Sequence, residues 1–172
     1  MGNTTCCGPP CLCYDGLPSA TTYTAHKSSY PAFSPSFYGK VRVVKVIDGD
    51  TFNVLGRLRK GGPLAVHKCR LRGVDCPETK SSNPHEAYVS KLAAAFVSRL
   101  LLDKTVKLEQ EPATSALYKR KGKFGRLLVD VRVRGRLLSQ ALLETHLAVS
   151  YDGKTKAPFT PTFLAHNPMP PA

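Results

Sequence analysis

Hydrophobic positions in the first half of the chain form strand-like runs that end at turn residues. These runs are residues 40–46, 51–58 and 64–72. Valine-rich runs separated by Asp-Gly and Gly-Gly-Pro turns favour β-strands, so the pattern predicts three consecutive strands. In the third run Cys69 and Leu71 share one face, while Arg70 and Arg72 share the other. We therefore expect Cys69 to be a buried core residue.

A helical period follows these strands. Asn83 is a typical cap residue, Pro84 suits the first helical position, and Glu86 lies three residues after the cap. Apolar residues then recur at helical spacing, namely Val89, Leu92, Ala93, Phe96, Val97, Leu100 and Leu101. Beyond this helix the pattern predicts strands over residues 105–109 and 127–133 and a short helix over residues 137–146.

The order of these elements predicts an α+β fold that is mainly β. Three strands, a helix, two strands and a second helix suit a five-stranded OB-fold barrel, which leaves no open sheet edge. We place this domain at residues 39–151. Residues 1–38 hold five prolines and lack an apolar period, and residues 152–172 are similar, with Pro158 and Pro161 blocking a helix. We therefore expect disordered N- and C-terminal tails.

The positive charge of the chain is concentrated in the predicted domain. The 172 residues include 25 Lys and Arg against 12 Asp and Glu, a net charge of +13. Of these, 22 bases and 10 acids lie in residues 39–151. This charge predicts a polyanionic partner, nucleic acid first and anionic lipid second, although a solvated basic surface is an alternative. The hydrophobic content of 42% excludes a wholly disordered chain.

Three clusters of charged residues carry candidate chemistry. The turn after the first strand holds an acid on each side of Gly49, which a plain hairpin turn also explains. Arg70 precedes Asp75 and Glu78 at the end of a strand, where a charged loop with an internal ion pair is the alternative. Residues 119–126 contain five bases and two glycines, which suit either a phosphate clamp or a solvated loop.

Together the three clusters suit metal-assisted phosphodiester hydrolysis. The oxygen ligands of Asp50 and Asp75 suit Ca²⁺ or Mg²⁺ rather than a transition metal. A glutamate near such an ion can orient or deprotonate a water molecule. Two arginines can grip a phosphate and stabilise its transition-state charge. A single ion would serve as Lewis acid and template.

The same residues resemble the staphylococcal nuclease (thermonuclease) family. The resemblance rests on four motifs: Val46-Ile-Asp-Gly-Asp-Thr51, Arg70-Leu-Arg-Gly-Val-Asp-Cys-Pro-Glu-Thr79, Lys123-Phe-Gly-Arg126 and Leu138-Ser-Gln-Ala-Leu-Leu143. Their order and spacing agree with the family over about residues 40–151. The resemblance implies an OB-fold barrel and a Ca²⁺-dependent endonuclease that hydrolyses phosphodiester bonds of DNA and RNA and leaves 3′-phosphates.

For the metal, the resemblance implies that the side chains of Asp50 and Asp75 bind Ca²⁺ together with the backbone carbonyl of Cys76. The cysteine is a departure from the family, and it leaves the site intact because the ligand is the carbonyl and not the thiol. Asp48 matches an acid that holds metal-bound water.

For the reaction, the resemblance implies that Glu78 activates the attacking water. Arg70 and Arg126 match the two arginines on the scissile phosphate. Lys123 and Phe124 match a lysine and an aromatic residue beside the nucleotide. A phenylalanine in place of tyrosine keeps the stacking face and loses a hydroxyl hydrogen bond.

The chain departs from the family towards its C-terminal end, where a third charged helix and a tryptophan are missing. His146 stands where the second helix of the family commonly ends in glycine, and we interpret it as a helix terminator. Two other hypotheses remain beside an active enzyme. The chain would be a catalytically weak or inactive nuclease-like module that binds nucleic acid, or a scaffold on a membrane surface. The intact Arg70, Glu78 and Arg126 argue against the inactive module.

The N-terminal residues suggest lipid attachment. Gly2 follows the initiator methionine, and Cys6 and Cys7 offer palmitate sites beside a myristoyl chain, although position 6 lacks the favoured Ser or Thr. Zinc or disulfides are alternatives, but the cysteine spacing is poor for zinc and no signal peptide points to an oxidising compartment. No run approaches the about 20 apolar residues of a membrane span. We expect an intracellular monomer that associates with membranes through its lipid.

Overall fold

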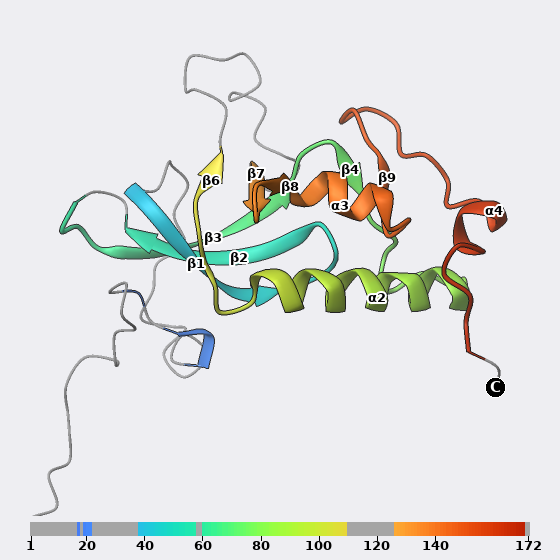
Figure 1. Cartoon of the computed structure of the whole chain (residues 1–172), viewed down its shortest axis with the longest axis horizontal. Helices are drawn as coiled ribbons and strands as arrows, with labels where there is room; N and C mark the ends of the chain where they lie inside the picture. Colours follow the sequence, from blue (N-terminus) through green and yellow to red (C-terminus); the bar gives the residue numbers. More distant parts are fainter. Residues whose placement is uncertain (1–16, 18, 22–37, 58–59, 110–125, 171–172) are drawn as a thin grey trace, which may run out of the picture.

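The computed structural model describes residues 17, 19–21, 38–57, 60–109 and 126–170 of the chain (Figure 1). The first part of the sheet consists of three long strands, β1 (Tyr38–Val46), β2 (Thr51–Arg57) and β3 (Leu64–Leu71). They pair antiparallel in the order of the sequence, and β2 and β3 keep one register along their length. The three strands predicted for this part of the chain are confirmed.

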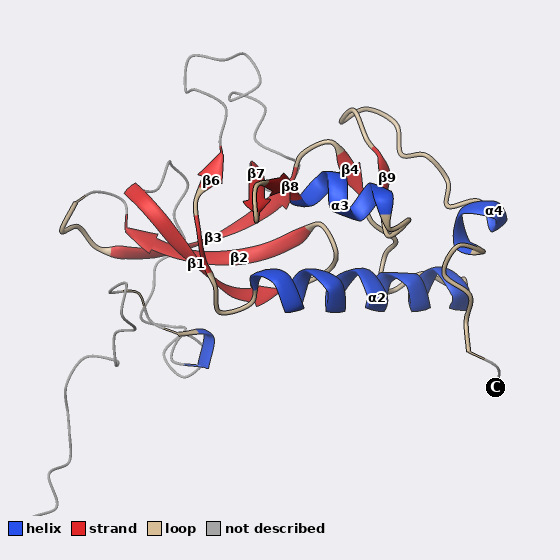
Figure 2. Ribbon diagram, viewed as in Figure 1, coloured by secondary structure: helices blue, strands red, loops and turns tan. Residues whose placement is uncertain are grey.

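The strand predicted over residues 105–109 is divided between the two ends of the sheet. Its first half, β5 (Thr105–Val106), pairs with β1, and its second half, β6 (Leu108–Glu109), pairs with β7 (Leu127–Val133). β7 also lies parallel to β3, and β8 (Arg136–Leu137) extends it as a hairpin. Because consecutive segments take both ends, the sheet curls on itself (Figure 2). This arrangement confirms the mainly β, OB-like α+β fold.

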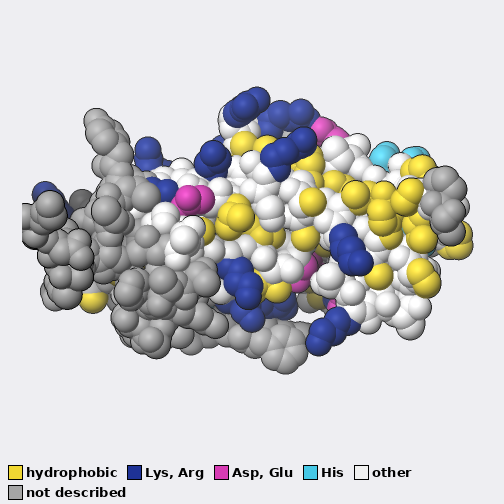
Figure 3. All heavy atoms as spheres, turned by 90° about the horizontal axis from the view of Figure 1, so that it is seen from below, with side chains coloured by type: hydrophobic (Ala, Val, Ile, Leu, Met, Phe, Trp, Pro, Cys, Tyr) yellow, Lys and Arg dark blue, Asp and Glu magenta, His cyan; other side chains and the backbone are white. Residues whose placement is uncertain are grey.

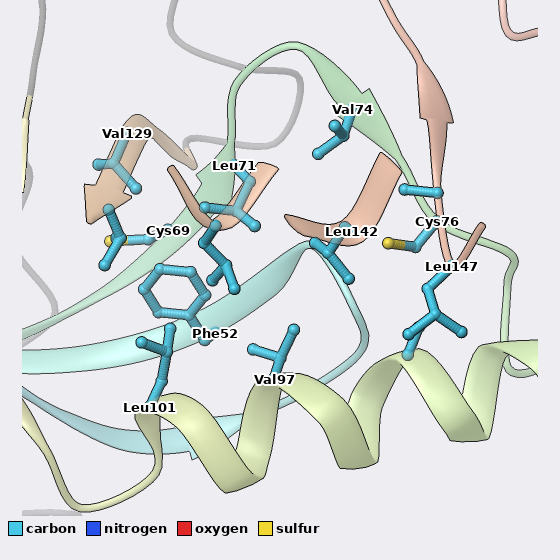
Figure 4. Close-up of a cluster of buried hydrophobic side chains, with 14 of the residues drawn as sticks. Phe52, Cys69, Leu71, Val74, Cys76, Val97, Leu101, Val129, Leu142 and Leu147 are labelled. Atoms are coloured by element: carbon cyan, nitrogen blue, oxygen red, sulfur yellow. The ribbon is translucent and has the colours of Figure 1, made fainter. Parts of the chain in front are cut away.

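The long helix α2 (Pro84–Leu101) packs its apolar face against the curled sheet. Its start is the predicted one, since Asn83 Oδ1 accepts a hydrogen bond from the His85 N–H at 2.9 Å. The buried core between helix and sheet includes Phe52, Cys69, Leu71, Val97 and Leu101 (Figure 4). Full burial of a large apolar side chain contributes about 1.5–3 kcal/mol, so this face fixes the helix on the sheet. The prediction that Cys69 is a core residue is confirmed.

The segment after β8 also carries regular structure. It contains α3 (Leu138–Glu144), β9 (Val149–Ser150), which pairs antiparallel with β4 (Val74–Asp75), and α4 (Pro161–Leu164). The expectation of a disordered C-terminal tail is therefore wrong for residues 161–164. Pro161 starts α4 instead of blocking it, because the first helical position needs no N–H donor. Leu164 is buried in the core, and α4 lies beside α2.

Helix α3 ends at a residue in the left-handed conformation. His146 has a φ of 52°. Its N–H donates to the Leu143 carbonyl at 3.1 Å, and the Leu147 N–H donates to the Leu142 carbonyl at 2.9 Å. These two bonds form a Schellman C-cap, which confirms the prediction that His146 terminates this helix. In the part of the chain that the structure describes, no helix is long and apolar enough to cross a membrane.

Candidate active site

The turn between β1 and β2 packs tightly against the rest of the site. The Ile47 N–H donates to the Thr51 carbonyl at 2.9 Å, and the Asp50 N–H donates to Asp48 Oδ1 at 3.1 Å. A Cβ added to Gly49 would lie 2.6 Å from Ala93 Cβ on α2. Only glycine therefore lets the turn approach the helix this closely. The acids on either side of Gly49 therefore lie in a hydrogen-bonded turn, and the Asp50 side chain is buried.

Arg70 joins two carboxylates that are far apart in the sequence. Its Nη1 donates to Asp50 Oδ1 and its Nη2 donates to Asp75 Oδ1, and both acids are almost fully buried. The guanidinium carbon also lies 5.9 Å from the centre of the Tyr151 ring, within the range of a cation–π contact. Arg70 on β3 thus lies between two buried anions, Asp50 from the turn before β2 and Asp75 from β4.

Asp50 is held by more than this ion pair. Its Oδ1 accepts from Thr51 Oγ1 at 2.8 Å, and its Oδ2 accepts from the Cys76 N–H at 2.8 Å. Burial raises the pKa of Asp50 to about 6, although the Arg70 charge opposes this change. The carboxylate is therefore less stable in its charged form than an exposed aspartate, and a bound cation would favour that form.

Asp75 and Glu78 meet a lysine from the C-terminal segment. Lys156 Nζ lies 2.9 Å from Glu78 Oε1 and 3.3 Å from Asp75 Oδ2. Asp75 Oδ2 is buried and accepts no hydrogen bond of good geometry, so its main neighbour is the ammonium charge. Glu78 is exposed, and its hydrogen bond with Lys156 lowers its pKa. Glu78 is therefore a carboxylate at neutral pH.

The Cys76 thiol does not behave as a metal ligand. Its side chain is buried in the core, and burial raises its pKa well above the usual value for a cysteine, with nearby Asp50 acting in the same direction. A protonated thiol is a poor ligand. The backbone of the same residue instead contacts the site, through the N–H that Asp50 accepts. The expectation that the Cys76 carbonyl binds a metal stays a prediction.

The remaining predicted site residues fall in two groups. Arg126 directly precedes β7, on which Leu127 pairs with Cys69, so the chain brings Arg126 beside the strand that carries Arg70. The others lie outside the described residues, namely Gly2, Cys6, Cys7, Lys123 and Phe124. Their roles stay predictions.

Sequence reasoning missed two residues that contact the predicted site. They are Tyr151, against Arg70, and Lys156, against Asp75 and Glu78. Both follow β9, and β9 reaches the site only because it pairs with β4. A single lysine in a Pro-rich segment gives no local sign that it will contact Asp75 and Glu78.

The described ranges contain no group of three or more His, Cys, Asp or Glu side chains that could hold a metal ion. The donor set nevertheless fits a hard cation when backbone oxygen is included. Asp50 and Asp75 are buried carboxylates that need positive charge, and Asp75 Oδ2 already faces a lysine ammonium at 3.3 Å. The residues present therefore suit Ca²⁺ better than a thiolate-binding metal.

The chain is similar to a known protein family. The chain matches the family described as "Staphylococcal nuclease homologue" over residues 68–164, which is more than half of its length. The match includes the end of β3, then β4, α2 and the segment up to α4, with Arg70, Asp75, Glu78 and Lys156 among its residues. The chain matches no curated protein.

Proposed function

Since the chain belongs to the staphylococcal nuclease homologue family, we propose that it is a Ca²⁺-dependent endonuclease. In this proposal it hydrolyses phosphodiester bonds of DNA and RNA and leaves 3′-phosphate products. The observation that carries the proposal is a cluster of charged side chains. In it Arg70 pairs with both Asp50 and Asp75, and nearby Glu78 pairs with Lys156. Burial raises the pKa of Asp50 in this cluster to about 6, and a perturbed pKa beside specific charged partners is typical of a functional site.

The buried acids would hold the metal. Asp50, Asp75 and the backbone carbonyl of Cys76 are the proposed ligands, and Asp48 supports the site through water. What supports this choice is the all-oxygen donor set and the buried Asp75 Oδ2, which lies 3.3 Å from the Lys156 ammonium. Bound Ca²⁺ would supply Lewis-acid stabilisation of the phosphate charge.

Glu78 would act as the general base. It would take a proton from the water whose oxygen attacks phosphorus. The bond from phosphorus to the 5′ oxygen would break, and this oxygen would gain a proton from solvent and leave as a hydroxyl. Its lowered pKa keeps it charged at neutral pH, and its exposure admits water and substrate. Arg70 and Arg126 would donate hydrogen bonds to the phosphate oxygens and stabilise the extra negative charge of the transition state.

The surface charge supports a nucleic-acid substrate. The net charge is +13, and in Figure 3 Lys and Arg side chains occupy several places on the visible face whereas Asp and Glu are few. Such a field raises the local concentration of a polyanion and speeds its association. Lys123 and Phe124 would contact the nucleotide beside the scissile bond.

Digestion of plasmid DNA and of RNA by the pure full-length protein tests the proposal. We expect cutting in Ca²⁺, no cutting in excess chelator, and 3′-phosphate ends on the products. Glu78→Gln should lower turnover by about 10²–10⁴-fold and leave DNA binding nearly unchanged. Glu144→Gln is the matched control, because Glu144 pairs with Arg136 on the surface.

The alternative is a catalytically weak or inactive nuclease-like module that binds nucleic acid. Folded protein that binds DNA but does not cut it in Ca²⁺ would establish this alternative. A Glu78→Gln variant that cuts at the wild-type rate would instead show that Glu78 is not the base.

A further inference from the structure

Lys156 holds a position next to the proposed metal ligand and the proposed base. Its ammonium lies between Asp75 Oδ2, at 3.3 Å, and Glu78 Oε1, at 2.9 Å. The Asp75 side chain is 1% exposed, so its free oxygen sees little water, while the Lys156 side chain is half exposed. The lysine thus covers a buried anion from the solvent side.

The segment that carries Lys156 is attached at both of its ends. On one side Ser150 pairs with Val74, and the Tyr151 N–H donates to the Gly73 carbonyl at 3.0 Å. On the other side Leu164 of α4 is buried in the core. Between these anchors residues 152–158 are exposed. The two anchored ends therefore keep Lys156 close to the acids. Its own ion pairs are partly exposed, and such pairs are weak enough to break.

We propose that Lys156 is an internal counter-cation that neutralises the free oxygen of Asp75, one of the proposed metal ligands, and is displaced when Ca²⁺ binds. The inference rests on the proposed function, in which Asp75 is a ligand of Ca²⁺. The loop of residues 152–160 then sets the Ca²⁺ concentration at which the site fills. A lysine in this loop competes with the metal, and a neutral residue does not.

The charges of the site explain the competition. Within the ion-paired group, the carboxylates of Asp50, Asp75 and Glu78 face the two cations Arg70 and Lys156, which leaves this group with a formal charge of −1, to which nearby Asp48 adds further negative charge. Without the lysine the charge of the group is −2, which attracts a divalent ion more strongly. A cation on Asp75 Oδ2 would also lie within a few ångströms of the ammonium, where like charges repel even in a polar surrounding.

Calorimetric titration of the full-length protein with Ca²⁺ alone tests the inference without nuclease activity. We expect Lys156→Gln to lower the Kd for Ca²⁺ by up to about fivefold, the range that corresponds to the loss of a partly exposed ion pair. Lys156→Arg keeps the charge and should stay near the wild-type Kd. Lys154→Gln is the matched control, because Lys154 is 80% exposed and 4.0 Å from Asp152.

The outcomes separate the inference from the proposed function. Equal or weaker Ca²⁺ binding by Lys156→Gln overturns the inference and leaves the Ca²⁺-dependent nuclease standing. If neither the wild type nor any variant binds Ca²⁺, the proposed metal site fails and the inference fails with it.

A second measurement uses only the wild-type chain and so avoids any folding defect of a variant. Acetylation of lysine amines, followed by mass spectrometry, reports how free each ammonium is. We expect Ca²⁺ to increase the acetylation rate of Lys156 several-fold and to leave the rate of Lys154 unchanged. An unchanged rate at Lys156 in saturating Ca²⁺ would show that the metal does not displace it.

Discussion

Arg70 is the cation between two buried carboxylates, and replacing it by methionine removes the charge while keeping a long side chain. The side chains of Asp50 and Asp75 are 2% and 1% exposed, so neither can recover its charge stabilisation from water. Removing one partner of a buried ion pair costs about 3–5 kcal/mol, because the other charge stays buried. We expect Arg70→Met to lower the free energy of unfolding by this amount at pH 8.

The cost should depend on pH, because Asp50 can become neutral by binding a proton. Burial raises the pKa of Asp50 from 3.8 to about 6 in the folded protein. The folded state therefore binds the proton more tightly than the unfolded state, and stability falls as pH rises from about 4 to about 6. A shift of this size corresponds to about 3 kcal/mol. Without Arg70 the pKa rises further, so Arg70→Met should be closer to the wild type at pH 5 than at pH 8.

Urea unfolding at pH 5 and pH 8, followed by circular dichroism because the chain has no tryptophan, measures both effects. Arg72→Met is the control, since Arg72 pairs with Asp130 at 2.6 Å on the partly exposed side of the sheet and should lose about 0–1 kcal/mol. Adding Asp50→Asn to Arg70→Met should recover part of the loss. Equal losses for the two arginine variants, or a loss for Arg70→Met that is the same at both pH values, would refute this reasoning.

Three further predictions concern packing and the N-terminus. Gly49→Ala should cost about 1–3 kcal/mol in thermal unfolding, because its Cβ would lie 2.6 Å from Ala93 Cβ, and adding Ala93→Gly should relieve part of the loss. Leu164→Ala should cost about 2–5 kcal/mol in urea unfolding, against under about 0.5 kcal/mol for the exposed Leu102→Ala, and similar losses would show that α4 contributes little to the core. Mass spectrometry of protein from eukaryotic cells should find an acyl chain on Gly2, and an unmodified Gly2 would remove the lipid-anchor prediction.

The parts of the fold that the sequence predicts well are those with a local signal. The cap at Asn83 and the apolar period after it locate α2 within one residue of its observed start. Turn residues likewise separate β1, β2 and β3. The sequence also predicts that Asp50 and Asp75 gather at one place, and in the structure Arg70 pairs with both of them.

The parts that could not be predicted depend on contacts between distant residues. From the sequence alone, Pro161 can either stop a helix or start one. In the structure it starts α4, whose Leu164 is buried in the core. The contact between Lys156 and Glu78 spans 78 residues of chain, so no local period contains it. The division of residues 105–109 between β1 and β7 is likewise visible only once the sheet has curled.

The pairing of β4 with β9 has a consequence for how the protein is made. Residues 48–78 leave the ribosome well before residues 149–156, so a growing chain contains Asp75 and Glu78 before it contains their later neighbours. Until β9 emerges, the strand that carries Asp75 has no partner, and Tyr151 is not yet against Arg70. The acidic cluster therefore gains its last contacts only after residues 149–156 have been synthesised, well after the acids themselves.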